Sequence, residues 1–503
     1  MKKLITFSLF TILFILLMIS FISNTTIKPI SYQENNGRVF LIVIDAAEWN
    51  VINPLIEQGE LPNFKNLKEK GSWGHLESPT GFSPIEWTSI ATGKNEENHG
   101  IHNWTKEGRI VTSNDIQSKR IWNILNDYGK SVGVCYYLFT RPPEQVNGFM
   151  ISDLSLHYLL HNHISNETYP HNLSKEIEEN KLTSVQFPDT STALYLLKKY
   201  EPDFFAFGHV AIDKLQHYLW KYWEPEKFNF TDKDKIDKYK KVLIDEYKRM
   251  DNFIGELDRY NQTIFVVSDH GAYAVVPPFY VSLFSDMYNE LQITEKINIT
   301  YKRFYEGVNS HRIHLNNEFT EDEKKKIIKM LKSIKYAMKN ETFFFNISPS
   351  SGNIIEVMFT ISLRDITEDH SRQFWSYIPL VSPNGKIFNL TIIEFSGHHK
   401  NPSTPGILLA KGEGIKENYE IKDAVTYDIT PTILYLYGLP VPKDMDGKVL
   451  KDMVKGEYLV NHPVEYLDKN LQSAEKIEES INDVNKTISR KIRERLVHLG
   501  YSV

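Results

Sequence analysis

The sequence predicts an α/β protein with a mostly parallel sheet covered by helices on both faces. Continuous apolar runs of strand length, such as RVFLIVID at 38–45 and TIFVVSD at 263–269, alternate with amphipathic helical patterns. Such runs are typical of strands buried on both faces, and the intervening helices connect parallel strands. Charged residues directly follow these runs, which places polar groups at the carboxyl edge of the sheet, where α/β proteins bind ligands.

Composition limits the classes of partner. The 503 residues carry 58 Lys and Arg against 64 Asp and Glu, a formal charge of -6, which argues against nucleic-acid duplex as a partner. A small anionic substrate would therefore need a local metal or cationic site. The single cysteine, Cys135, lies in an apolar run, so it is interpreted as a core residue and no intrachain disulfide can form.

The N-terminus has the pattern of a membrane segment. Lys2 and Lys3 precede an uncharged apolar stretch from Leu4 to about Ser23, longer than the apolar h-region of a usual signal peptide and without an A-x-A cleavage pattern. We therefore expect residues 1–29 to form an uncleaved anchor, with a cleaved signal peptide as the alternative. The two lysines would stay inside, which places the body on the outer side of the membrane.

The remaining chain divides by composition. Between about 275 and 385 aromatic and polar residues dominate, and the strand–helix alternation is lost. We expect an inserted cap there that shapes the substrate entrance. The predicted division is a first core part at 36–275, the cap at 276–385, a second core part at 386–460 and a helical extension at 461–503.

Two acidic residues stand at the ends of predicted buried strands. Asp45 ends the first apolar run, where the alternative interpretation is a helix N-cap. Asp269 and His270 directly follow another run. Burying both without partners would cost several kcal/mol, so they indicate a metal or a hydrogen-bond network.

Three further segments carry ligand-type side chains. Asp213 and His217 are spaced i,i+4, so on a helix they can chelate one cation, although a surface ion pair is the alternative. Ser83 precedes Pro84, which favours a helix start that can hold a phosphate oxygen, with an N-cap as the alternative. His398 and His399 follow late in the chain. The combined set of carboxylates, imidazoles and a hydroxyl suits two divalent cations that clamp a phosphoryl group.

Several segments resemble one family in the same order. They are VIDAAEWNVINPLIEQGELPNFKNLKEKG, SPIEWTSIATGKNEENHGIHNW, VVSDHGA, GILLAKGEGI and DITPTILYLYGLPVPKDMDGKVL. This chain resembles the alkaline phosphatase superfamily, in particular the type I phosphodiesterase and nucleotide pyrophosphatase branch with its prokaryotic alkaline-phosphatase-like phosphohydrolases. The resemblance covers most of residues 38–455, excluding the cap, and implies an alkaline-phosphatase-like sheet sandwiched by helices.

The resemblance also implies roles for individual residues. Ser83 would be the nucleophile, forming a phosphoseryl intermediate, and would bridge two divalent cations, with Zn²⁺ favoured and Mn²⁺ as the alternative. The implied ligands are Asp213, His217 and His399 (alternatively His398) in one site, and Asp45, Asp269 and His270 in the other. Members of the branch often have threonine as nucleophile and asparagine three residues later. Here these positions are Ser83 and Glu86, and Glu86 is taken as a substrate-binding candidate; Ala46 replaces a usual glycine.

The predicted function is two-metal hydrolysis of a small phosphate ester. The leading prediction for its substrate is a phosphodiester or a nucleotide pyrophosphate. The alternatives are a phosphomonoesterase or phosphotransferase of the same superfamily, or a non-catalytic surface module. A sulfatase is disfavoured because the segment from Ser83 to Trp87 lacks the C/S-x-P-x-R pattern that formylglycine formation requires. The leaving group and the oligomeric state stay open.

Overall fold

The computed structural model describes residues 37–468, apart from a set of short gaps. These are 108, 154–166, 183–188, 283–286, 289–290, 292–296, 301–306, 316–319, 340, 350–352, 362–366, 369–374 and 400–403.

A nine-stranded sheet forms the centre of the molecule. Its order is β20 (Tyr419–Val425), β2 (Ser72–Glu77), β19 (Gly406–Lys411), β9 (Thr263–Val267), β1 (Val39–Ile44), β8 (Phe204–His209), β5 (Val132–Cys135), β6 (Gly148–Ile151) and β7 (Thr168–Tyr169). The pairs from β9 through β6 are parallel, whereas β19 and β7 run antiparallel to their neighbours. The predicted mostly parallel α/β sheet is confirmed.

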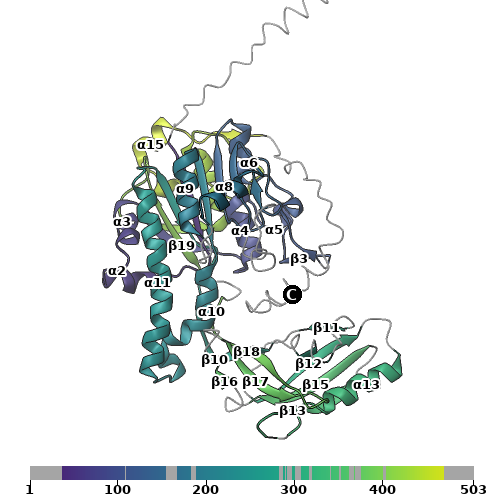
Figure 1. Ribbon diagram of the computed structural model, residues 1–503. Coiled ribbons are helices and arrows are strands. Elements are labelled where there is room, and N and C mark those ends of the chain that lie inside the picture. Colours follow the sequence, from purple (N-terminus) through teal and green to yellow (C-terminus); the bar gives the residue numbers. More distant parts are fainter. Residues whose placement is uncertain are drawn as a thin grey trace, which may run out of the picture.

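Helices cover both faces of this sheet (Figure 1). One face packs against α4 (Ser83–Thr92), α6 (Ile121–Asp127) and α14 (Ile429–Leu436). The other packs against α2 (Trp49–Glu57), α3 (Pro62–Lys70), α8 (Leu173–Glu179), α9 (Thr190–Tyr200), α10 (Ala211–Trp223) and α11 (Lys233–Asp258). Successive β1 side chains enter opposite cores: Leu41 lies in one and Ile42 in the other. A strand with both faces buried therefore reads as a continuous apolar run.

Short elements complete the core. They are α5 (Glu96–His99), β3 (Thr105–Lys106), β4 (Arg109–Ile110), β21 (Val441–Pro442), α15 (Gly456–Asn461), β22 (Tyr466–Leu467) and the 3₁₀ turns Ser113–Asp115, Pro225–Phe228, Thr426–Asp428 and Lys451–Met453.

An inserted region of two antiparallel sheets lies beside the core, below it in Figure 1. One sheet has the order β10 (Tyr273–Ser282), β18 (Ile387–His398), β17 (Trp375–Val381) and β13 (Lys335–Tyr336), with β16 (Thr367–Glu368) beside β17. The other has the order β11 (Ile297–Thr300), β12 (Gly307–Leu315), β15 (Ile354–Ile361) and β14 (Phe344–Pro349), and α13 (Glu321–Lys332) contacts β14. These elements share their own hydrophobic core.

The inserted region ends later than the sequence indicated. Residue 386 was predicted to begin the second core part, but β18 pairs with β17 from Ile387 to Ile393 and with β10 from Ile392 to His398. The chain therefore returns to the nine-stranded sheet only at Gly406. The prediction was wrong because β18 is apolar on both faces, like a core strand: Ile392 lies in the core of the inserted region, and Ile393 packs against the central core.

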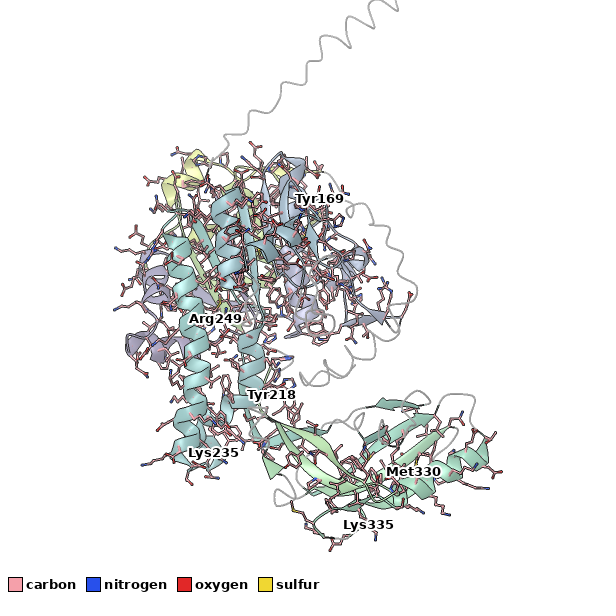
Figure 2. The ribbon with its side chains drawn as sticks, in the orientation of Figure 1. Tyr169, Tyr218, Lys235, Arg249, Met330 and Lys335 are labelled. Carbon is pink, nitrogen blue, oxygen red and sulfur yellow. The ribbon has the colours of Figure 1, made fainter. Side chains whose placement is uncertain are left out.

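Helix α10 and strand β18 join the two parts. The Lys221 ammonium contacts both carboxylate oxygens of Glu394 at 2.7 and 2.8 Å, and the Lys221 amide donates to the Ser396 hydroxyl at 3.0 Å. At Gly397 a Cβ atom would lie 2.3 Å from the Gln216 carbonyl oxygen. Tyr218 on α10 marks this junction in Figure 2. The helix and the strand thus lie so close together that residue 397 has to be a glycine.

Two predictions concern residues largely outside the described part of the chain. The anchor at 1–29 lies entirely outside it, so the anchor and the extracytoplasmic placement stay predictions. Among the described residues, none of the helices has the length and apolar character needed to cross a bilayer. Of the predicted helical extension at 461–503, the described residues include strand β22, which pairs with β21, and residues beyond 468 lie outside the described range.

We expect Gly397→Ala to weaken the joint between α10 and β18. The added methyl would meet backbone in a close-packed contact, and overpacking of this kind costs about 1–3 kcal/mol. The measurement is the apparent unfolding temperature with a chelator present, so that cation binding cannot contribute. Gly456→Ala is the matched control, because no described atom lies within 4 Å of its added methyl. Equal unfolding temperatures for the two variants would contradict the close approach.

Candidate active site

Asp45 and Asp269 lie at neighbouring strand ends. Strands β1 and β9 are parallel, with Val43 opposite Val267, so the chain leaves both strands at the same edge. The two carboxylates are 3% and 0% exposed. Ala46 has a φ of 58°, in the left-handed region that favours glycine, and its amide donates to Asp269 Oδ1 at 3.3 Å. The turn therefore aims a backbone donor at the second carboxylate.

His270 connects both acids to Ser83. Its Nε2 lies 3.0 Å from Ser83 Oγ, 3.4 Å from Asp45 Oδ1 and 3.3 Å from Asp269 Oδ2. Its Nδ1 lies 3.0 Å from the Gly271 carbonyl oxygen. A carbonyl can only accept, so Nδ1 carries the proton and Nε2 offers its lone pair to this group. Backbone-oriented imidazoles of this kind are typical of metal ligands.

Helix α4 positions Ser83. The helix begins at Ser83 itself, with Pro84 in its first turn, and all ten of its residues are buried. The first turn of a helix presents unpaired amide N–H groups and the positive end of the helix dipole, which favour a phosphate oxygen. The predicted helix start is confirmed. The Ser83 hydroxyl is fully buried beside His270.

A second group of ligand-type side chains forms around His217. Asp213 and His217 lie one turn apart on α10, as predicted, and His217 Nε2 is 3.3 Å from Asp213 Oδ1. His217 Nδ1 lies 2.9 Å from the Gly397 carbonyl oxygen, which again leaves Nε2 as the lone-pair nitrogen. His398, the last residue of β18, and His399, which follows it, both place their rings near this imidazole, with centroids 5.1 and 5.8 Å away. The sequence left open whether His398 or His399 is the late ligand, and the structure places both rings near His217.

The described residues contain two triplets that could each hold a metal ion. Within each triplet, one ligand atom per residue lies within 4.8 Å of the others. The triplets are Asp45, Asp269 and His270, and His217, His398 and His399. The stacked rings of His270 and His399, with centroids 4.3 Å apart, place the triplets side by side.

The buried carboxylates of Asp45 and Asp269 need compensating positive charge. Burial, reinforced by the charges of Asp269 and Asp213, raises the pKa of Asp45 well above its usual range. Burial also raises the pKa of Asp269. Among the described residues no donor hydrogen-bonds to Asp45 Oδ1 or Asp269 Oδ2. Two buried carboxylates with such oxygens are costly unless positive charge compensates them, and a divalent cation fits this need.

His399 is held neutral. Burial first, and then the nearby imidazoles of His270, His398 and His217, lower its pKa well below the usual value. A neutral imidazole is the form that binds a metal.

Glu86 does not face the site as a substrate-binding residue would. Its Oε1 accepts hydrogen bonds from the Thr80 amide at 2.8 Å and the Thr80 hydroxyl at 2.7 Å, and its Oε2 accepts from the Thr426 hydroxyl at 2.6 Å. Both oxygens are thus engaged in tying the loop before α4 to the turn before α14. The sequence suggested a phosphate contact, which this arrangement does not provide.

A buried hydrogen-bond network behind Asp45 was not predicted from the sequence. Gln216 Nε2 donates to the Ala46 carbonyl at 2.6 Å, and Tyr247 lies between Gln216 Oε1 and the Glu48 amide, at 3.2 and 3.3 Å. Burial raises the pKa of Glu48 to about 7. The only local signals were that Glu48 follows Asp45 by three residues and that Gln216 precedes His217. The network fixes the left-handed turn at Ala46.

We expect Glu86→Gln to become stabilising, relative to the wild type, as the pH rises. Burial raises the pKa of Glu86 above its ordinary 4.5, so its contribution is complete below that pH and is lost as the pH rises through the raised pKa. Glutamine cannot ionise, so its advantage in unfolding temperature should grow as the pH rises above the ordinary glutamate pKa of 4.5. Glu86→Ala, which removes the acceptors of Thr80 and Thr426, should be destabilised by about 1–3 kcal/mol. A pH-independent difference, or a changed KM in the glutamine variant, would contradict this role.

Comparisons with known proteins agree with the motifs. The family model described as type I phosphodiesterase / nucleotide pyrophosphatase matches residues 39–358, which include most of the inserted region but end before His398. Similar solved structures include human ectonucleotide pyrophosphatase/phosphodiesterase 5, at 13% identity and a TM-score of 0.42, covering 83% of this chain and 100% of that one. The inactive murine counterpart in complex with AMP has 13% identity, the same coverage and a TM-score of 0.44.

Phosphonoacetate hydrolase from Sinorhizobium meliloti, in complex with phosphonoformate, has 14% identity and a TM-score of 0.38, covering 79% of this chain and 95% of that one. No curated protein sequence matches the chain. The family match spans more than half of the chain and includes three of the five segments that carried the predicted resemblance. This chain belongs to the type I phosphodiesterase/nucleotide pyrophosphatase family of hydrolases.

Proposed function

We propose that the protein hydrolyses phosphodiesters or nucleotide pyrophosphates with two bound divalent cations and with Ser83 as the nucleophile. The observation that carries the proposal is the convergence of the two triplets next to the Ser83 hydroxyl. Each element of the set comes from a different part of the chain, and no packing requirement explains why the fold would gather carboxylates and imidazoles there.

The chain supplies matched ligands for both cations. Asp45, Asp269 and His270 would hold one, and Asp213, His217 and a late histidine would hold the other. The cations would supply positive charge to the phosphate and to the attacking and departing oxygens. The mixed carboxylate and imidazole ligands favour Zn²⁺, with Mn²⁺ as the alternative.

Ser83 is placed to attack phosphorus. Its Oγ lies 3.0 Å from His270 Nε2, the nitrogen that also approaches Asp45 and Asp269. The first turn of α4 offers amide groups for a phosphate oxygen. Attack by Oγ would form a phosphoseryl intermediate and release the leaving group, and water would then restore the hydroxyl.

Removal of the nucleophile should abolish turnover. We expect Ser83→Ala to lower kcat for a chromogenic phosphodiester by at least about 1000-fold, because no other described hydroxyl lies at His270 Nε2. Ser174→Ala, on α8, is the control, since its hydroxyl only donates to the His171 carbonyl. The matching monoester is assayed in parallel. Undiminished diester turnover by Ser83→Ala would remove the basis of the proposal, and a preference for the monoester would change it to a phosphatase.

Metal removal provides an independent test. Dialysis against a chelator should eliminate hydrolysis, and Zn²⁺ or Mn²⁺ should restore it, because the buried carboxylates need a compensating cation. The readouts are the initial rate and the metal content per chain by elemental analysis. Full activity in a preparation that contains less than one cation per chain would contradict the two-metal mechanism.

A further inference from the structure

We propose that His398 is a third imidazole ligand of the site formed with His217 and His399. The inference rests on the proposed function, because it concerns one of the two cation sites. The resemblance implied only one late histidine. The structure instead brings the imidazoles of both His398 and His399 close to that of His217. Only the His399 ring also stacks on His270 of the other triplet.

The ring positions distinguish the two histidines. The His398 ring lies 5.1 Å from the His217 ring, and the His399 ring lies 5.8 Å from it. His399 also stacks on His270 of the neighbouring triplet at 4.3 Å, so it stands between the two sites. His398 has no such contact with His270 among the described ring pairs, and it is 6% exposed. His398 is therefore the late imidazole that belongs to the His217 group alone.

The register of β18 on α10 fixes this arrangement. The carbonyl of Gly397, the residue before His398, orients His217 through Nδ1 at 2.9 Å. The close approach of Gly397 to Gln216 and the Lys221–Glu394 pair hold the strand at one height along the helix. The strand that orients one imidazole thus delivers the next one, and these contacts leave little freedom for the backbone at 398.

The surroundings of His398 confine its ring. Its ring lies 5.7 Å from that of Phe279, which stacks on Phe395 at 5.0 Å, and 4.5 Å from the ring of His399. One ligand nitrogen of His398 lies within 4.8 Å of a ligand nitrogen of His217 and of His399, so the ring can share a cation with both.

The inference has a chemical consequence. A site with three imidazoles and Asp213 is richer in nitrogen than its neighbour, which has one imidazole and two carboxylates. Imidazole ligands suit Zn²⁺, whereas carboxylates suit Mn²⁺ and Mg²⁺. The two sites should therefore differ in metal preference, with the His217 site the more selective for Zn²⁺.

The test is cation binding by the full-length protein, measured for His398→Ala, His398→Gln and His399→Ala. His75→Ala, at an exposed position of β2, is the control. Zn²⁺ affinity is measured by competition with a chromophoric chelator. We expect two Zn²⁺ per wild-type chain and a loss of affinity of more than about 1000-fold at one site in each variant except the control. Loss of an outer partner of a ligand typically costs only about 10- to 100-fold.

A substitution that creates a signal completes the test. In His398→Cys loaded with Co²⁺, a thiolate at 398 should give a new sulfur-to-metal charge-transfer band, because the single natural cysteine, Cys135, is buried and belongs to neither triplet. Absence of the band in a protein that unfolds at the wild-type temperature, or wild-type Zn²⁺ affinity in both His398→Ala and His398→Gln, would overturn the inference and leave the proposed function intact. A wild-type protein that binds no cation would overturn both.

Discussion

The burial of two carboxylates at adjacent strand ends is the constraint on which the rest of the site depends. Asp45 and Asp269 are separated from water by the sheet and its helices, and each has a raised pKa because its charge is poorly solvated. An uncompensated pair of this kind would cost several kcal/mol. The Ala46 amide, which donates to Asp269, meets part of that cost, and a cation would meet the remainder.

The network behind Asp45 follows from the same constraint. Ala46 adopts a left-handed conformation that costs an alanine more than a glycine, and Gln216 holds its carbonyl in place. Gln216 and His217 are neighbours on α10, so one helix braces the first carboxylate and also supplies a ligand to the other group. The two candidate sites therefore share one rigid support.

The inserted region is part of the candidate active site. Strand β18 begins at an exposed hairpin, where Ile387 is 64% exposed, and ends at His398. Its side chains contribute to two hydrophobic cores along the way. Since the same strand carries the late histidines, any shift of the inserted sheet along α10 would displace ligand-type side chains. The position of the inserted sheet can thus change the arrangement of the candidate metal ligands as well as the shape of the substrate entrance.

The sequence revealed those features that depend on local pattern. Unbroken apolar runs predicted β1 and β9, the i,i+4 spacing predicted that Asp213 and His217 share a helix face, and Pro84 predicted the start of α4. Each of these patterns lies within a few residues of the feature that it predicts, so no tertiary information was needed.

Features that depend on distant residues could not be predicted in this way. Glu86 is occupied by Thr426, 340 positions away, and no local pattern reveals that a carboxylate beside a nucleophile faces the other way. The end of the inserted region was misplaced because β18 is buried on both faces. The approach of both His398 and His399 to His217 depends on a close contact at Gly397, which becomes visible only when α10 and β18 are packed together.

The most direct test of the account is anomalous diffraction at the zinc edge from crystals of the zinc-loaded protein. The account predicts two peaks, one among Asp45, Asp269 and His270 and the other among Asp213, His217 and the late histidines, with Ser83 Oγ beside them. A single peak, or peaks away from these side chains, would contradict the claim that this fold gathers its buried acids and imidazoles to hold two cations.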